Sequence, residues 1–395
     1  GGQGVITLNA TNGDDINITR TWRLGVRSPY PWATNQLRAT LEPGEQWKPH
    51  FDLSTLRDSS IQAMLTISNR PAINFRSQFE NLLHYPYGCL EQTTSSTYPW
   101  LLLNEDMVNQ LDLNDSIEQE FKQPFSEAFR LTQIQDGIEK LKAKQLSNGG
   151  FGYWDSSSWE SRWGTVYATE FLVDARKQGV VIDDDMLKRA IERLTFFVNN
   201  NPESDMWSDS ADYYAFSYRA YAAFVLAKAD AISLSFVRRL YDQAMTNNDD
   251  TVASSHAKST PSFDESGLAW MHLAGALHLL NDTSRAQKAL ELALKIDRKQ
   301  YAYYRDYGSI VRDQALSLAV ALELGLDDGN LADKMIESLQ SKRWFSTQER
   351  IALLKVARQY ANKDSEWRAS IQLPSGDQSL VQTQAFNSVF DADQL

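Results

Sequence analysis

Apolar residues recur at helical spacing through the middle of the chain, whereas its two ends show the pattern of β-strands. Residues 1–74 hold β-branched, aromatic and polar residues around the turn signals NGDD and Pro43-Gly44, without helical periodicity. Polar and apolar residues alternate again after about Glu366, in SLVQTQAF. Alternation bounded by such turns predicts strands, so we expect β structure at both ends.

The region between these ends is predicted to be helical. Apolar residues follow the aspartates of VIDDD at spacings of three and four, and aspartates suit the start of a helix. Ser346 and Glu349 form the pattern of a capping box before another apolar run. Apolar sets with helical spacing are Leu131, Ile134, Ile138 and Leu141, then Leu187, Ile191, Leu194 and Val198, and then Leu234, Val237, Tyr241 and Ala244.

We therefore predict a mainly α protein in which a ring of helical hairpins, an α/α toroid, is inserted into a small β module formed by both chain ends. Roughly ten to twelve helices are expected, in pairs that recur about every 40 to 50 residues, as in repeat architectures. An open solenoid is the competing geometry, because the pairs share a pattern but little identity. The predicted parts are residues 1–74, residues 75–366 and residues 367–395.

Composition narrows the classes of function. The 395 residues are 42% hydrophobic and 23% charged, as in a globular protein that can bury a large core. A net charge of −12 gives no electrostatic support to nucleic-acid binding. Cys89 is the only cysteine, which excludes an internal disulfide framework and a multi-cysteine metal site. No His-x-x-x-His spacing supports a metal, and no cofactor is expected.

Cys89 is followed three positions later by Gln92 in the stretch YPYGCLEQTT. Side chains three apart on a helical turn share a face and can touch. A cysteine sulfur held against a glutamine amide can displace ammonia and form an internal thioester. A thiolate leaves far more readily than an amide nitrogen, because its conjugate acid has a pKa of about 8.5. Local aromatic and apolar residues that could exclude water are Tyr85, Tyr87, Tyr98, Trp100 and Leu101.

Other interpretations of Cys89 are a small buried hydrophobic residue or a nucleophile with a histidine base. His84 is too close in sequence to indicate a catalytic triad, and His272 and His278 lie in an apolar helix where core or surface positions are expected. The aspartates at 183–185 are expected to begin a helix rather than bind an ion. On the short Cys-x-x-Gln pattern alone, a buried structural cysteine is the favoured interpretation.

The stretch LLHYPYGCLEQ resembles the P-Y-G-C-x-E-Q motif of the thioester-containing proteins, the alpha-2-macroglobulin and complement group. Three further segments resemble that family's in the same order along the chain: SNGGFGYWD, SRWGTVYATEFL and WFSTQERIALLKVA. Four matches in order favour a thioester over a merely buried cysteine. Leu90, where animal members usually have glycine, makes the chain similar to the large alpha-2-macroglobulins of Gram-negative bacteria.

The resemblance implies a thioester-domain fragment of a longer protein. Its fold is expected to be an α/α toroid at residues 75–366, inserted in a CUB-type β-sandwich to which residues 1–74 and 367–395 contribute. The remaining domains of the parent protein are then expected partners. A membrane is expected as a partner only through a lipid anchor on the full-length parent.

The resemblance also assigns roles at the motif. Cys89 and Gln92 are expected to form the thioester, with Gly88 and Glu91 as supporting motif residues. Local shielding residues are expected to be Tyr85, which best matches the shielding tyrosine of bacterial members, and Tyr87. The rest of the family's shield belongs to a domain outside this chain, so a labile or already hydrolysed thioester is expected.

The function implied by the resemblance is that of a protease-trapping inhibitor in the periplasm. A lysine amine of an attacking protease is expected to react once with Gln92 and free Cys89, without turnover, so the protein is not expected to be an enzyme. Complement-type members carry a downstream histidine that redirects the bond toward hydroxyls, and NNPESDMWSDSADYYAF has none. Amines are therefore the expected targets, and Asp205 and Ser208 in that zone are expected surface residues.

Two other classes of function stay open on the sequence. An α/α-toroid enzyme of transferase, cyclase or glycan-processing type would need zinc ligands or two carboxylates at a defined separation. A helical-repeat binding module would keep Cys89 merely buried. Reaction with methylamine separates a thioester from both alternatives.

Overall fold

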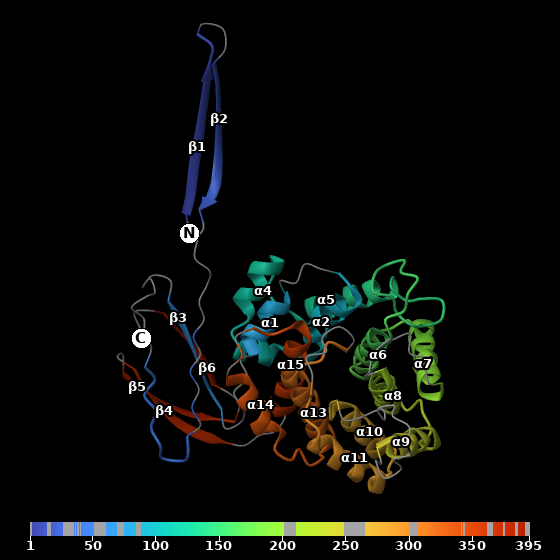
Figure 1. The fold of residues 1–395 in the computed structure, drawn as a ribbon. Helices are drawn as coiled ribbons and strands as arrows, with labels where there is room; N and C mark the ends of the chain where they lie inside the picture. The colour runs from blue at the N-terminus through green and yellow to red at the C-terminus, as the bar shows by residue number, and fades with distance from the viewer. Residues whose placement is uncertain are drawn as a thin grey trace. The chain divides into compact units, whose positions relative to one another are not determined.

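The computed structural model describes residues 2–13, 17–26, 35, 37, 39, 41–50, 61–68, 75–83, 88–200, 211–248, 265–299, 306–340, 342, 344–361, 366–373, 376–383 and 386–391. The chain divides into two compact units, residues 1–54 and residues 55–395. The first contains the hairpin of β1 (Gly2–Thr11) and β2 (Asn17–Val26), which pair antiparallel (Figure 1); both aspartates of the predicted NGDD turn lie outside the described residues. The predicted Pro43-Gly44 turn is present, with Glu45 N donating to the Glu42 carbonyl at 3.0 Å.

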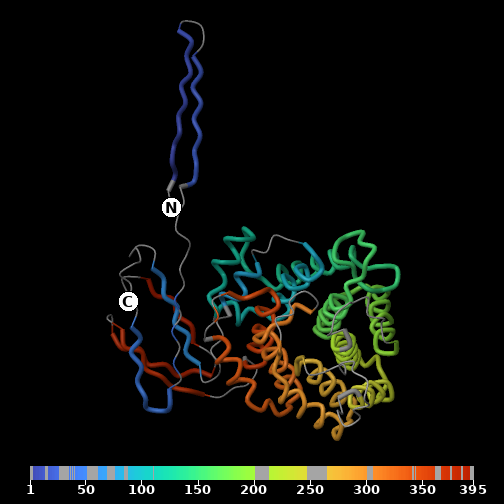
Figure 2. The backbone as a smooth tube through the Cα atoms, viewed as in Figure 1, coloured from blue at the N-terminus to red at the C-terminus, as the bar shows by residue number. Residues whose placement is uncertain are grey.

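The two ends of the second unit meet in one antiparallel strand pair. β3 (Gln62–Ile67) lies beside β6 (Phe386–Asp391), although they come from opposite ends of this unit (Figure 2). β4 (Trp367–Leu373) and β5 (Gly376–Gln382) form a separate hairpin. The prediction that a helical domain is inserted between β segments from both ends is confirmed. The predicted borders at residues 74 and 366, and the CUB-type label, stay predictions.

Between β3 and β4 the second unit is helical. Its described residues contain fourteen helices, more than expected, because α3 and α4 have only six and eight residues and show no periodic pattern. The helices are α1 (Phe75–Leu83), α2 (Leu90–Leu102), α3 (Glu105–Gln110), α4 (Asn114–Phe121), α5 (Glu127–Lys142), α6 (Arg162–Lys177), α7 (Asp184–Asn199), α8 (Ala211–Lys228), α9 (Leu234–Asn248), α10 (Leu268–Leu279), α11 (Thr283–Lys295), α13 (Ile310–Leu324), α14 (Leu331–Gln340) and α15 (Thr347–Ala361).

Six of these helices form a closed inner ring. Contacts run from α2 to α6, α8, α10, α13 and α15 in turn, and α15 packs back against α2 (Figure 1). An outer helix packs on each member of the ring: α5 on α2, α7 on α6, α9 on α8, α11 on α10, α14 on α13 and α1 on α15. The contact between the last and the first inner helix decides the geometry, so the α/α toroid is confirmed over an open solenoid.

The burial pattern of the sequence separates inner from outer helices. All residues from Leu268 to Leu277 in the inner helix α10 are buried, as expected for a helix that is apolar on every side. In the outer helix α11, the buried residues are Ala286, Ala289, Leu290 and Ala293, at spacings of three and four. In α5, Ile134, Ile138 and Leu141 face the core as predicted, but Leu131 is 41% exposed.

The predicted helix starts are largely present. Asp183 caps α7 by accepting from the backbone N–H groups of Asp185 and Met186, so these aspartates begin a helix as expected. The capping box before α15 is also confirmed: Ser346 N donates to Glu349 Oε2 at 2.9 Å, and Glu349 N donates to Ser346 Oγ at 3.2 Å. The capping box fixes the first turn of α15, the helix that closes the ring against α2.

Charged groups are buried where the inner helices face one another. Glu170 of α6 forms ion pairs with Lys355 at 2.8 Å and Lys228 at 3.8 Å, and it accepts a hydrogen bond from the Tyr221 hydroxyl. Burial acts to raise the pKa of Glu170, but the two lysines overcome it and hold the pKa below its usual value. His272 stacks on Tyr221 with 4.4 Å between ring centroids. It is a core residue, in agreement with the expectation that this histidine occupies a core or a surface position.

Replacing His272 by glutamine is expected to weaken the loss of stability on acidification. Burial, with Arg312 and Lys355 nearby, lowers the pKa of His272 to about 3. In the unfolded chain the imidazole is protonated below its ordinary pKa of about 6.5, whereas in the folded chain it is protonated only near pH 3. The free energy of unfolding therefore falls as the pH drops from about 6.5 to about 3. Between pH 7 and pH 5 the loss from this group is about 2 kcal/mol, which the variant should not show.

Urea unfolding at pH 7 and pH 5 measures this difference. Leu273→Ala is a matched control on the same helix, because it removes a buried side chain without adding or removing a titrating group. It should lower the free energy of unfolding by a similar amount at both pH values. An unchanged pH dependence in His272→Gln would contradict the assignment of a buried neutral imidazole.

Candidate functional site

Cys89 and Gln92 face each other at the start of the first inner helix. Cys89 is the N-cap of α2, and its side chain accepts from the backbone N–H of Gln92. In return, Gln92 Oε1 accepts from the backbone N–H of Cys89 at 3.3 Å. This is a capping box in which cysteine stands where serine or threonine is usual. The reciprocal bonds bring the sulfur and the side-chain amide together on one turn, as the spacing predicted.

The surroundings of Cys89 act in opposite directions on the pKa of its thiol. Burial raises the pKa of the half-buried thiol, and the Glu91 carboxylate adds to the rise. The backbone N–H groups of Gln92 and Glu91 act in the opposite direction, as does the charge of Lys144. The N–H groups of a first helical turn stabilise negative charge. The thiol is therefore kept protonated at rest, while two amides are in place to stabilise sulfur once it carries charge.

The loop SNGGFGYWD and the start of α6 pack against this turn. Leu90 N donates to the carbonyl oxygen of Tyr153 at 2.8 Å. A Cβ atom on Gly164, in the first turn of α6, would lie 2.6 Å from Leu90 Cδ2, so a larger residue here would push the Leu90 side chain away. Lys144, 5% exposed, forms an ion pair with Asp155 of the same loop. Two segments singled out in the sequence therefore lie at the Cys89 turn.

Glu91 ties the Cys89 turn to the start of α15. It is 4% exposed, and its Oε1 accepts from Ser95 Oγ at 2.8 Å, Thr347 Oγ1 at 2.7 Å and Gln348 Nε2 at 2.7 Å. Ser95 Oγ also lies 3.0 Å from the Tyr167 hydroxyl of α6. Thr347 and Gln348 belong to the third matched segment, WFSTQERIALLKVA. All four resembling segments thus meet around one helical turn.

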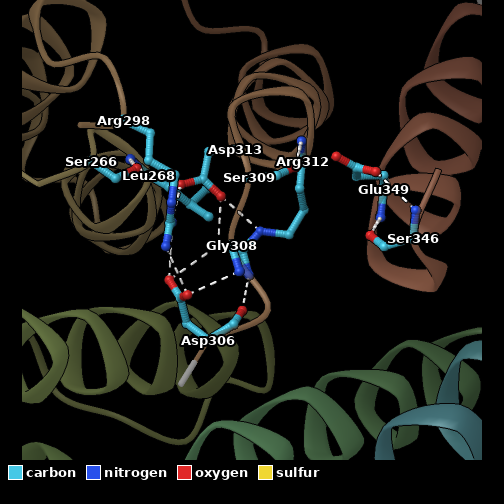
Figure 3. A network of polar contacts seen from close by, with 10 residues as sticks. All are labelled: Ser266, Leu268, Arg298, Asp306, Gly308, Ser309, Arg312, Asp313, Ser346 and Glu349. Carbon is cyan, nitrogen blue, oxygen red and sulfur yellow. Dashed lines mark hydrogen bonds and ion pairs between the residues drawn. The ribbon is translucent and has the colours of Figure 1, made fainter. Parts of the chain in front are cut away.

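The N-termini of four inner helices, α2, α6, α13 and α15, lie close together at this end of the ring. Thr347 at the start of α15 contacts Glu91 in the first turn of α2, and α6 begins beside the same turn. Ser309, the N-cap of α13, donates to Glu349 in the first turn of α15 (Figure 3). Helix N-termini carry partial positive charge. The end of the toroid that holds Cys89 therefore favours negative charge that develops during a reaction.

The other predicted site residues are placed as follows. Gly88 directly precedes the cap, and a Cβ atom there would meet nothing within 4 Å. Tyr85 and Tyr87 lie outside the described residues, as do His84, Asp205 and Ser208, so their roles stay predictions. Tyr98, Trp100 and Leu101 are core residues farther along α2 and not part of the Cys89 turn.

Sequence reasoning missed several residues at the site. Tyr153, Thr347 and Gln348 lie within the matched segments, so the resemblance could have identified them. Lys144 carries no local signal, because its place at the site follows from its ion pair with Asp155. Within the described part of the chain, no group of three or more His, Cys, Asp or Glu side chains could hold a metal ion. The helices described are also too short or too polar to cross a membrane.

The fold and the Cys89 turn are similar to those of thioester domains. Residues 61–213 match the family model described as "A-macroglobulin TED domain". The chain is 30% identical over 383 residues to the alpha-2-macroglobulin of Escherichia coli K12, covering 95% of this chain and 22% of the relative. It is 29% identical over 312 residues to the alpha-2-macroglobulin of Xylella fastidiosa Temecula1, covering 77% of this chain and 18% of the relative.

Solved structures agree with these sequence matches. Salmonella alpha-2-macroglobulin reacted with methylamine superposes with a TM-score of 0.77 at 30% identity, over 99% of this chain and 24% of that one. A native Escherichia coli alpha-2-macroglobulin structure from domain MG7 to the C-terminus gives a TM-score of 0.77 at 29% identity, over 100% of this chain and 58% of that one. The likeness to bacterial alpha-2-macroglobulins is thereby confirmed. The chain spans about a fifth of the length of the curated relatives it matches.

Proposed function

We propose that Cys89 and Gln92 form an internal thioester that reacts once with an amine. The observation that supports this most is the capping box, in which each of the two side chains bonds the other residue's backbone. In the forming step, Cys89 Sγ attacks Gln92 Cδ, the new C–S bond replaces the bond from Cδ to Nε2, and ammonia leaves with the thiol proton. The acyl carbon of Gln92 is then activated without any cofactor.

The same hydrogen bonds suit both the forming and the opening of this bond. The Cys89 backbone N–H, already 3.3 Å from Gln92 Oε1, would stabilise negative charge that builds on this oxygen when Cδ is attacked. On opening, an amine nitrogen bonds to Cδ, the C–S bond breaks, and the amine proton ends on sulfur. The N–H groups of Glu91 and Gln92 would stabilise the departing thiolate. This turn would thus serve as oxyanion site and leaving-group site together.

The biological role that fits this chemistry is the trapping of proteases by the longer parent protein. Among similar solved structures, the Salmonella protein is described as reacted with methylamine and an Escherichia coli protein as trypsin activated. We extend both to this chain: a lysine of a protease attacks Gln92, and the protease becomes covalently attached. Since the product retains the amide and the thioester is consumed, the protein acts as an inhibitor and not as an enzyme. The setting we propose is the periplasm.

Methylamine is expected to add once to freshly purified protein and to release one thiol. Intact mass and thiol titration measure the two events, and Cys89→Ala should lose both. A thiol that is free from the start in every preparation, with Gln92 unmodified, would contradict the thioester. Gln92 found as glutamate supports a bond that formed and was hydrolysed, the outcome expected if shielding by other domains is missing.

A further inference from the structure

Tyr307 has a backbone conformation that bulky side chains rarely adopt. Its φ angle is +54°, in the left-handed region, between Asp306 and Gly308. Such conformations cost free energy for residues other than glycine and persist only where surrounding contacts enforce them. The contacts on either side of Tyr307 therefore show what holds it.

A buried set of ion pairs fixes both neighbours of Tyr307. Asp306 is 1% exposed and accepts from Arg298 Nη2 at 2.9 Å and Arg312 Nη2 at 3.3 Å (Figure 3). Gly308 N donates to the same carboxylate at 2.9 Å. A Cβ atom on Gly308 would lie 2.0 Å from the Arg298 guanidinium, so a larger residue here would displace Arg298 from its ion pairs. We call Arg298, Asp306, Arg312 and Asp313 the ion-pair lock.

The side chain of Tyr307 packs on the first turn of α6, which lies against Leu90 of the Cys89 turn. The Tyr307 ring packs on Trp163, with 4.9 Å between centroids, and Trp163 precedes the Gly164 that touches Leu90. Its phenol is hydrogen-bonded to the side chain of Tyr153, whose carbonyl accepts from Leu90 N. Burial raises the pKa of Tyr307, and the nearby Tyr153, Glu91 and Cys89 raise it further.

We infer that Tyr307 is a wall of the thioester pocket, kept in place by the ion-pair lock, and that its ring excludes water from the bond between Cys89 and Gln92. The inference rests on the proposed thioester. It assigns part of the shielding to a residue more than two hundred positions from the motif, in addition to the predicted Tyr85. The inference assigns the exclusion of water to the ring, so the ring matters more than the hydroxyl group.

Removal of the ring is expected to shorten the lifetime of the thioester. In Tyr307→Ala, thiol release in amine-free buffer should be about tenfold faster than in the unsubstituted chain, equivalent to about 1.4 kcal/mol of barrier. Tyr307→Phe keeps the ring and should stay close to the original rate. Tyr241→Ala, on the outer helix α9, is the matched control for loss of a buried tyrosine and should leave the rate unchanged.

A second measurement tests the wall without requiring a thioester. In a Gln92→Glu background, Cys89 stays a thiol, and its rate of alkylation by iodoacetamide reports access to the pocket. Tyr307→Ala should raise this rate about tenfold, and Tyr307→Phe should not. Equal alkylation rates in Gln92→Glu alone and with either Tyr307 substitution would show that Tyr307 does not restrict access to Cys89. If the unsubstituted chain reacts with methylamine but Tyr307→Ala releases its thiol at an unchanged rate, the inference about Tyr307 is wrong and the proposed thioester still stands.

Discussion

Gln92→Glu is expected to abolish methylamine incorporation completely and to leave one free thiol per chain from the moment of purification. A carboxylate resists attack by a thiol, because its resonance-stabilised charge opposes the nucleophile and oxide is a poor leaving group. The substituted side chain still offers an oxygen to the Cys89 backbone N–H, now 3.3 Å from Gln92 Oε1. The capping box and the start of α2 should therefore survive, and only the acyl chemistry should be lost.

Intact mass and thiol titration before and after methylamine check this result, and thermal unfolding checks the fold. Gln119→Glu on the short helix α4 is a matched control, since it makes the same change at an exposed position. It should react with methylamine like the unsubstituted chain. Methylamine bound covalently to the Gln92→Glu variant would show that the acyl group lies elsewhere.

Arg312→Leu is expected to lower the free energy of unfolding by about 3–5 kcal/mol, because it leaves buried carboxylates with too little positive charge. Arg312 is 1% exposed and pairs with Asp313 at 2.5 Å and Asp306 at 3.3 Å. Burial acts to raise the pKa of Asp313, but Arg312 and Arg298 overcome it and hold the pKa below its usual value. Leucine supplies volume but no charge, so the variant isolates the electrostatic loss.

Urea unfolding measures this loss. Arg368→Leu is the matched control: Arg368 pairs with Glu366 at 2.8 Å, but its side chain is 75% exposed. An exposed pair contributes at most about 1 kcal/mol, so the control should unfold almost like the unsubstituted chain. A loss in Arg312→Leu no larger than in the control would mean that the ion-pair lock does not stabilise this region.

Local features of the fold were predictable from the sequence. The capping box of Ser346 and Glu349 needs only two residues three positions apart, and the structure has it. The pattern of helix pairs predicted a ring but could not exclude an open solenoid, because closure depends on contacts between α15 and α2, which lie far apart in the sequence. Leu131 shows the limit of periodicity: it fits the spacing of α5 but lies at the edge of the buried face.

The candidate site divides in the same way. Cys89 and Gln92 could be paired from their spacing, because one helical turn fixes their proximity. Glu91 could be noticed only through resemblance, and its partner Thr347 lies 256 positions away. Tyr307 was missed because its position depends on Arg298 and Arg312, which no local pattern connects to Cys89. The geometry of one helical turn is thus predictable from the sequence, whereas the residues packed around the Cys89 turn are set by tertiary contacts.

The closing contact of the ring has a consequence for the order in which the site is built. The turn with Cys89 lies on the first inner helix, and the residues that hold Glu91 lie on the last. During synthesis the N-terminal part of a chain emerges first, and contacts between distant segments form late. The Cys89 turn therefore acquires its full set of contacts only after α15 has folded against α2. If the proposed thioester depends on these contacts, it forms only in the completed domain.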